Sequence, residues 1–230
     1  MSLAKRRKLT IKFGGPDTEA TSSPKTHGSI RFGNIPMVQL KVGPNATLFH
    51  VHKDLICGSS PFFKAAFTGG FKESECSINL EDDDPEVFEN IIQWLYRRNL
   101  ETLSSIEAVA DENYFMDLVR SYTLADKYGI TALQNDVMGL LRGTLKSLKS
   151  LQLTHAKYVY ENTAHGSQLQ EFLVACFVWQ IDLDWFSRKE AFAWLEDVPA
   201  FAVQLAVALA SRANGDPSPF HDQSAFHVIP

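Results

Sequence analysis

The feature that most constrains this fold is a run of short strand and helix patterns between residues 37 and 96. Met37–Val42 alternates apolar and polar residues, which predicts a half-buried strand. Thr47–Val51 continues the pattern after a Gly-Pro-Asn turn, so the two segments predict a β-hairpin. A third strand is expected over Ser77–Leu80. Nothing in this run has the spacing of a catalytic motif, a metal site or a phosphate-binding loop.

Helical signals lie between and after these strands. Residues 53–57 predict a short helix that breaks at Gly58, and Ser60-Pro61 begins a second, because proline fits the first helical position. A third helix is expected after Asp84, whose side chain can cap it. The second helix groups four apolar residues on one face: Phe62, Phe63, Ala66 and Phe67. The third helix has apolar residues that we expect in the core: Val87, Phe88, Ile91, Ile92, Trp94 and Leu95.

Taken in order, these patterns resemble a BTB/POZ domain that extends from about Pro36 to Gly129. The resemblance rests on six short motifs: Val38–Gly43, Phe49–Lys53, Ser60–Phe63, Glu73–Ser74, Asp84–Phe88 and Trp94–Tyr96. Leu124–Gly129 also fits the later helix pair of that family. The resemblance implies an α+β fold, in which a small sheet with a hairpin accompanies a cluster of helices, followed by an all-helical extension. It also implies that the chain is a protein–protein interaction module.

The chain departs from the family pattern at Met37. Many members have an aspartate at this position, and in dimeric members it lies in a charged pocket near the basic residue that matches Lys53. Without the aspartate, Lys53 has no evident partner, so we expect only weak or rearranged homo-oligomers.

The chain is expected to have four parts. They are a flexible basic tail over residues 1–35, a BTB/POZ domain over 36–130, a helical extension over 131–212 and a flexible C-terminal tail over 213–230. The tails lack sustained apolar periodicity. The extension contains amphipathic stripes that must pack on one another to be stable. Its longest apolar stretch, Val198–Ala210, is expected to be a buried helix.

Two local patterns invite a structural interpretation. Thr10–Gly14 and Ser29–Gly33 are near copies of each other. They are either a coincidence or short strands that add to an exposed sheet edge. Gly139 and Gly143 have a G-x-x-x-G spacing, and the charges nearby favour close packing on a neighbouring helix over membrane association.

Charge is distributed unevenly along the chain. The net charge is −5, but residues 1–29 carry +4, so the rest of the chain carries −9. An acidic body does not favour nucleic-acid binding. The acidic run Glu81–Asp84 is expected to cap a helix and face solvent. A basic cluster near the N-terminus is either a nuclear import signal or a solvated tail: Lys5, Arg6, Arg7 and Lys8.

No cofactor or metal is expected from this sequence. Cys57, Cys76 and Cys176 are far apart and form no C-x-x-C, which indicates reduced thiols inside the cell, in the nucleus, the cytoplasm or both. No catalytic motif is recognisable, so the chain is not expected to be an enzyme. No signal peptide and no membrane-spanning run are evident.

The resemblance favours a substrate adaptor of a cullin-RING ubiquitin ligase. Cullin-binding members of the family have an apolar residue, any residue and then glutamate between a helix and the next strand, and Phe71 and Glu73 match this pattern. In the opposing interpretation Phe71 packs internally and Glu73 is solvated. The alternative functions are a BTB-mediated nuclear scaffold or transcriptional co-regulator without its own DNA-binding domain, and a purely oligomeric scaffold. The sequence does not reveal the protein that is recognised.

Overall fold

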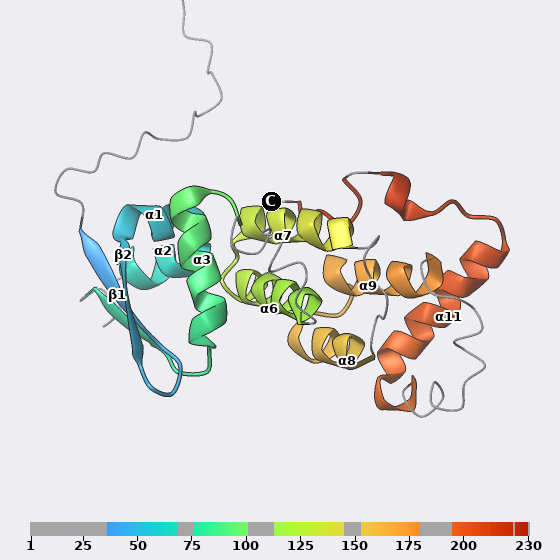
Figure 1. Ribbon diagram of the computed structural model, residues 1–230, viewed down its shortest axis with the longest axis horizontal. Helices are drawn as coiled ribbons and strands as arrows, with labels where there is room; N and C mark the ends of the chain where they lie inside the picture. The colour runs from blue at the N-terminus through green and yellow to red at the C-terminus, as the bar shows by residue number, and fades with distance from the viewer. Residues whose placement is uncertain are drawn as a thin grey trace, which may run out of the picture. The chain divides into compact units, whose positions relative to one another are not determined.

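The computed structural model describes six stretches of the chain: residues 36–68, 76–100, 113–144, 153–179, 195–222 and 224–229. The described strands form one sheet in the order β2-β1-β3. β1 (Met37–Val42) pairs antiparallel with β2 (Thr47–His52) and parallel with β3 (Ser77–Leu80), as Figure 1 shows. The hairpin and the third strand predicted from the sequence are therefore confirmed.

One face of this sheet is buried. In β1, Val38, Leu40 and Val42 are fully buried, whereas the residues between them are exposed. Val38 lies opposite Val51 of β2, so the two strands turn apolar side chains to the same side. Three helices contribute to the core with these strands: α1 (Lys53–Ser59), α2 (Pro61–Thr68) and α3 (Pro85–Arg97).

α3 forms as its sequence predicts. The Asp84 carboxylate accepts a hydrogen bond from the Glu86 backbone N–H at 2.9 Å and so caps the helix. Phe88 and Trp94 are 0% and 2% exposed, which confirms their place in the core. The Trp94 indole N–H donates to the Asp136 carboxylate at 2.7 Å, which joins α3 to α7 (Thr131–Thr144).

α2 differs from its expected pattern at one residue. Phe63 and Phe67 are buried, but Phe62 is 43% exposed. The centroid of the Phe62 ring lies 5.0 Å from that of Tyr128. The buried stripe of this short helix is therefore narrower than the sequence suggested, because only residues four apart point into the core.

A tight turn joins α6 (Tyr114–Lys127) to α7. Gly129 in this turn has a φ of 65°, in the left-handed region that glycine adopts without steric cost. One face of α6 is buried and carries Phe115, Leu118, Val119, Tyr122 and Ala125. The chain therefore leaves α6 before Gly129 and enters α7 just after it.

The two glycines of the G-x-x-x-G pattern lie on the exposed side of α7. Gly139 and Gly143 are exposed, and a Cβ atom added to either would meet no neighbouring atom within 4 Å. The prediction of close helix packing at these glycines is therefore wrong. The packed face of α7 carries its larger apolar residues instead: Leu133, Val137, Met138 and Leu141.

The remaining described helices are α8 (Leu153–Asn162), α9 (Gln168–Trp179) and α11 (Pro199–Ala213). α9 is central to this group, because residues 172–178 are all buried. It contacts both α8 and α11. The Phe177 ring of α9 lies 4.9 Å from the Phe201 ring of α11. α8, α9 and α11 thus share one packed core.

α11 is not the fully buried helix that its apolar sequence suggested. Phe201 and Leu205 are buried, but Val203 and Val207 are 65% and 64% exposed. Among the described residues, the side of α11 that carries Phe201 and Leu205 packs on the core, and the two valines lie on a more exposed side. Among the helices described, none is both long and apolar enough to cross a membrane.

The C-terminal segment departs from the flexible tail that was expected over residues 213–230. It forms a short helical turn, η3 (Pro219–His221), and then buries Phe226, which is only 9% exposed. The Phe226 ring lies 5.6 Å from the ring of Phe172 in α9. The Arg142 guanidinium of α7 donates to the Ala225 carbonyl oxygen at 2.9 Å. Apolar anchors and satisfied carbonyls therefore hold this segment on the helices.

Candidate interaction site

A polar cluster surrounds the turn between β3 and α3. The turn contains the acidic run Glu81–Asp84, and three of its four residues are exposed. Asp83 is the exception, because it is only 6% exposed. The expectation that this run faces solvent therefore fails at Asp83, whose carboxylate is turned into the protein.

Two donors satisfy the buried Asp83 carboxylate. The Lys127 ammonium donates to it at 2.7 Å, and the Tyr128 hydroxyl donates a second hydrogen bond. Burial, together with the hydrogen bond to Asp83 and the nearby negative charge, raises the pKa of Tyr128. The phenol therefore keeps its proton and remains a donor. These contacts fix the β3–α3 turn against the C-terminal end of α6.

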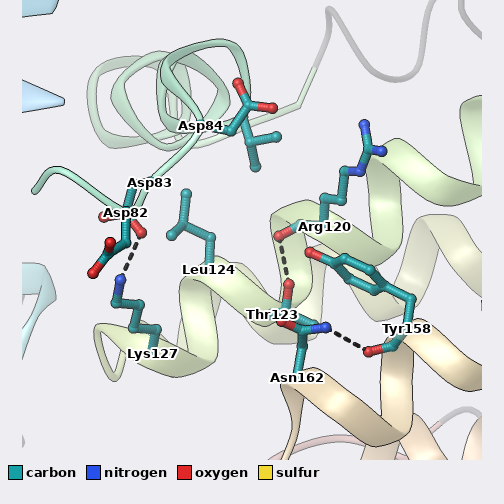
Figure 2. A pocket seen from close by; sticks show the side chains of 10 residues that line it. Asp82, Asp83, Asp84, Arg120, Thr123, Leu124, Lys127, Tyr158 and Asn162 are labelled. Atoms are coloured by element: carbon teal, nitrogen blue, oxygen red, sulfur yellow. Dashed lines mark hydrogen bonds and ion pairs between the residues drawn. The ribbon is translucent and has the colours of Figure 1, made fainter. Parts of the chain in front are cut away.

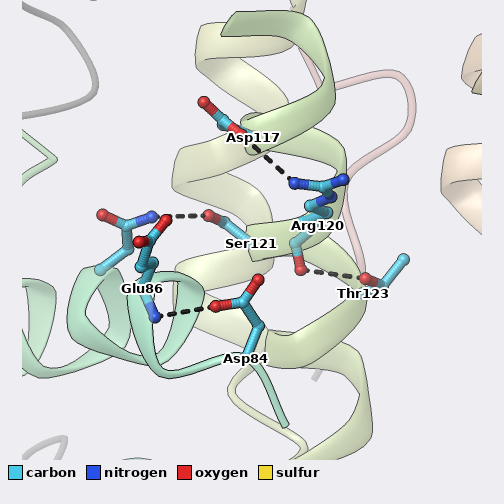
Figure 3. A network of polar contacts seen from close by, with 7 residues as sticks. Asp84, Glu86, Asp117, Arg120, Ser121 and Thr123 are labelled. Carbon is cyan, nitrogen blue, oxygen red and sulfur yellow. Dashed lines mark hydrogen bonds and ion pairs between the residues drawn. The ribbon is translucent and has the colours of Figure 1, made fainter. Parts of the chain in front are cut away.

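Two weaker polar contacts lie beside this turn, one between α3 and α6 and one within α6, as Figure 3 shows. The Asn90 amide donates to the Ser121 hydroxyl at 3.2 Å. The Arg120 guanidinium lies 3.9 Å from the Asp117 carboxylate one turn earlier, and the two side chains are 45% and 41% exposed. An exposed pair of this kind contributes about 0.2–1 kcal/mol. Arg120 can therefore exchange Asp117 for an external partner at little cost.

A pocket of about 530 Å³ opens beside the cluster. The acidic turn forms one wall, α6 contributes Arg120 and Lys127, and α8 contributes Tyr158 and Asn162 (Figure 2). The Asn162 amide donates to the Tyr158 carbonyl oxygen at 2.8 Å, which orients that side chain along α8. The pocket thus lies where α8 meets α6 and the β3–α3 turn.

The lining of this pocket is mostly polar. Asp83 pairs with Lys127, whereas Asp82, Asp84 and Arg120 supply exposed charges of both signs. Within the part of the chain that the structure describes, no group of three or more His, Cys, Asp or Glu residues could hold a metal ion. The pocket therefore has a polar lining of mixed charge.

A second surface lies at the end of α2. Lys53 was expected to lack a partner, but its ammonium donates to the Phe67 carbonyl oxygen at 2.9 Å. A cation is favourable there, because the last carbonyls of a helix carry partial negative charge. Beside Lys53, the His52 Nδ1 lies 2.8 Å from the Tyr96 hydroxyl. α1, the end of α2 and the last turn of α3 therefore meet where the chain leaves α2.

The site residues predicted from the sequence lie outside the described residues. Phe71 and Glu73 belong to residues 69–75, between α2 and β3. The basic cluster and both near-copy pentapeptides belong to residues 1–35. The basic cluster consists of Lys5, Arg6, Arg7 and Lys8.

Sequence reasoning missed the contact between Asp83 and the end of α6. Both partners lie in segments that were noticed, Asp83 in the acidic run and Tyr128 beside the Gly129 turn. They are 45 residues apart, and no local pattern pairs them. One sequence signal could have indicated this contact: the acidic run has four residues, and a helix cap needs only one of them.

Comparison with known proteins identifies the first part of the chain. Residues 37–145 match the family model of the BTB/POZ domain, a range that includes α7. The chain is 24% identical over 178 residues to human Kelch repeat and BTB domain-containing protein 6. This match covers 66% of this chain and 25% of that protein. It is 29% identical over 93 residues to BTB/POZ and MATH domain-containing protein 5 of Arabidopsis thaliana, covering 37% of this chain and 23% of that protein.

A shorter match has a higher identity. The chain is 45% identical over 49 residues to Kelch-like ECH-associated protein 1A of Danio rerio, which covers 21% of this chain and 8% of that protein. The chain spans a quarter or less of the length of these three relatives. The similarities therefore concern a shared domain, and in the first case they extend beyond residues 37–145.

Proposed function

Because this chain contains a BTB/POZ domain over residues 37–145, we propose that it is a substrate adaptor of a cullin-RING ubiquitin ligase. The domain and its BTB-containing relatives mark the chain as a protein-interaction module. The proposal adds that a cullin binds at Phe71 and Glu73 and that another protein binds elsewhere on the chain. It includes no catalytic step, and it assigns the protein to the nucleus, the cytoplasm or both.

The observation that carries the proposal is that both ends of the 69–75 connection are anchored. At the α2 end, Phe67 is buried and its carbonyl oxygen accepts from Lys53. At the β3 end, the Gln39 backbone N–H of β1 donates to the Cys76 carbonyl oxygen at 2.7 Å. A binding segment whose flanking residues are already fixed loses less entropy on binding than one with free ends.

The chemistry of the two residues fits a protein contact. An exposed aromatic side chain can act as an anchor, and such anchors contribute much of the energy of an interface. A glutamate two residues later can accept hydrogen bonds from backbone N–H groups or basic side chains of the partner. Phe62, which is exposed on α2, adds apolar surface to the helix that precedes the connection.

Cullin binding can be measured directly with purified proteins. The full chain should bind the N-terminal half of the third cullin, and Phe71→Ala or Glu73→Ala should weaken binding at least tenfold, about 1.4 kcal/mol. Lys72→Ala is the matched control, because it changes the residue between the two anchors. Unchanged thermal melting must accompany each variant. If the wild-type chain does not bind at tens of micromolar, the adaptor proposal is wrong.

A nuclear scaffold or transcriptional co-regulator is the second candidate. It is favoured by the basic cluster Lys5–Lys8 and by 30% identity over 71 residues to human Zinc finger and BTB domain-containing protein 21. In this role the chain would depend on a partner for DNA contact. Nuclear localisation of a tagged chain that is lost when the cluster is changed to alanine, combined with absence of cullin binding, would favour it.

A further inference from the structure

α9, α11 and the C-terminal segment enclose an open apolar groove. Its volume is about 640 Å³. Val174 and Ala175 of α9 contribute buried apolar surface, and Val203 and Val207 of α11 form an exposed edge. Phe226 of the C-terminal segment also lines the groove. In Figure 1, α11 runs obliquely past α9, and the C-terminal segment follows it.

Glu171, Asp216 and Arg212 are the charged side chains that line this groove, and the imidazole of His165 lines it as well. Glu171 and Asp216 line it, both are exposed, and neither takes part in an ion pair described by the structure. Arg212 also lines it, but its guanidinium donates to the Val178 carbonyl oxygen and lies 5.0 Å from the centroid of the Trp179 ring. These contacts hold the Arg212 guanidinium in place and leave its charge on the groove. Glu171 and Asp216 are exposed, so either carboxylate can pair with a basic side chain of a partner.

We propose that this groove binds a short peptide segment of a partner protein that has two or three apolar side chains beside a lysine or arginine. The apolar side chains would cover Val203 and Val207, whose exposure is high for aliphatic residues. The basic side chain would pair with Glu171 or Asp216 at the edge of the groove. The interface would thus have an apolar centre and a charged rim, as protein interfaces commonly do.

The shape of the groove favours a peptide over a small molecule. Small-molecule sites commonly bury 70–90% or more of their ligand in a concave cavity. Here two of the apolar lining residues are about two-thirds exposed on the edge of a helix, so a small ligand would remain largely in solvent. A peptide can span such an edge and place successive side chains on it.

This inference rests on the proposed function in one respect. If the chain is an adaptor, the peptide belongs to the protein that it presents to the ligase. The groove is built from helices outside residues 37–145, whereas the proposed cullin contact lies at Phe71 and Glu73. The two surfaces can therefore be disabled separately. Val207→Asp should leave cullin binding unchanged, and Phe71→Ala should leave peptide binding unchanged.

A displayed library of random peptides of about 14 residues, long enough for roughly four helical turns, tests the proposal. It is selected on the full chain and depleted on the Val203→Asp/Val207→Asp variant. Peptides with clustered apolar residues and an adjacent lysine or arginine should be enriched. In fluorescence anisotropy, the best synthetic peptide should lose at least tenfold in affinity for Val207→Asp. Its affinity for Ala206→Asp should equal its affinity for wild type, because Ala206 is an exposed α11 residue outside the groove.

Charge reversal provides the second arm of the test. The Glu171→Lys/Asp216→Lys variant should prefer the same peptide with glutamate in place of its basic residue. Thermal melting of every variant must match that of wild type, since all the changed residues are exposed. The proposal is wrong if no peptide depends on the two valines, if acidic and basic peptides bind wild type equally, or if only small apolar dyes bind there.

Discussion

The Tyr128 hydroxyl donates a hydrogen bond to the carboxylate of Asp83, a buried residue 45 positions earlier in the chain. This contact ties the β3–α3 turn to the end of α6, and Lys127 reinforces it from a half-exposed position. The pair stands at the edge of the pocket between the acidic turn and α8, so it sets the position of one pocket wall.

We expect Tyr128→Phe to reduce the free energy of unfolding by about 1.5–3 kcal/mol, because it removes a donor from a buried carboxylate. Lys127→Met should cost less, since the lysine side chain is half exposed and the lost ion pair is partly screened. Urea denaturation measures both effects. A larger loss for Lys127→Met than for Tyr128→Phe would show that the ammonium, rather than the phenol, is the main partner of Asp83.

Stability should fall at alkaline pH. Burial is the main cause that raises the pKa of Tyr122, Tyr128 and Tyr160 above the ordinary value of 10.0. Above that pH the unfolded chain loses phenol protons that the folded chain retains, so the free energy of unfolding decreases as pH rises. Below pH 10 these three tyrosines should not change the free energy of unfolding with pH. Tyr122→Phe should make the alkaline decrease shallower in urea titrations, and an unchanged slope would contradict this assignment.

Truncation of α3 core residues should be costly. Phe88→Ala and Trp94→Ala should each reduce the free energy of unfolding by about 3–5 kcal/mol, since both side chains are almost fully buried. Trp94→Ala also removes the indole N–H that donates a hydrogen bond to the Asp136 carboxylate. Glu89→Ala on the exposed side of the same helix is the control and should cost less than about 0.5 kcal/mol.

The C-terminal segment should be required for full stability. Removal of residues 214–230 deprives Phe172 of the Phe226 ring and Arg142 of its carbonyl acceptors, so the melting temperature should fall by several degrees. Phe226→Ala should reproduce much of that loss. Removal of residues 1–35 should leave melting nearly unchanged, and a large decrease would instead indicate that this segment pairs with the folded part.

Self-association should be weaker than in dimeric members of the family. Met37 occupies the position where many of them have an aspartate, and its side chain is 41% exposed at the start of β1. Lys53, the expected partner of that aspartate, binds the Phe67 carbonyl oxygen instead. Light scattering at micromolar concentration should show monomer or a concentration-dependent mixture. A dimer that persists at nanomolar concentration would contradict this expectation.

The sequence by itself determined the local elements of this protein. Alternation from Met37 to Val42 predicted a strand, and Asp84 predicted the start of a helix. Both signals depend on residues only a few positions apart. The BTB/POZ domain was recognisable for the same reason, since its motifs are short and their order can be read directly.

Tertiary structure alone decided which polar and apolar residues became partners. Asp83 could not be distinguished from its acidic neighbours, Phe226 looked like part of a loose tail, and Val203 and Val207 looked buried. Their environments depend on segments distant in sequence: α6 for Asp83, α9 for Phe226 and the course of α11 for the valines. Local periodicity records how apolar a side chain is, but burial depends on whether another segment comes to cover it.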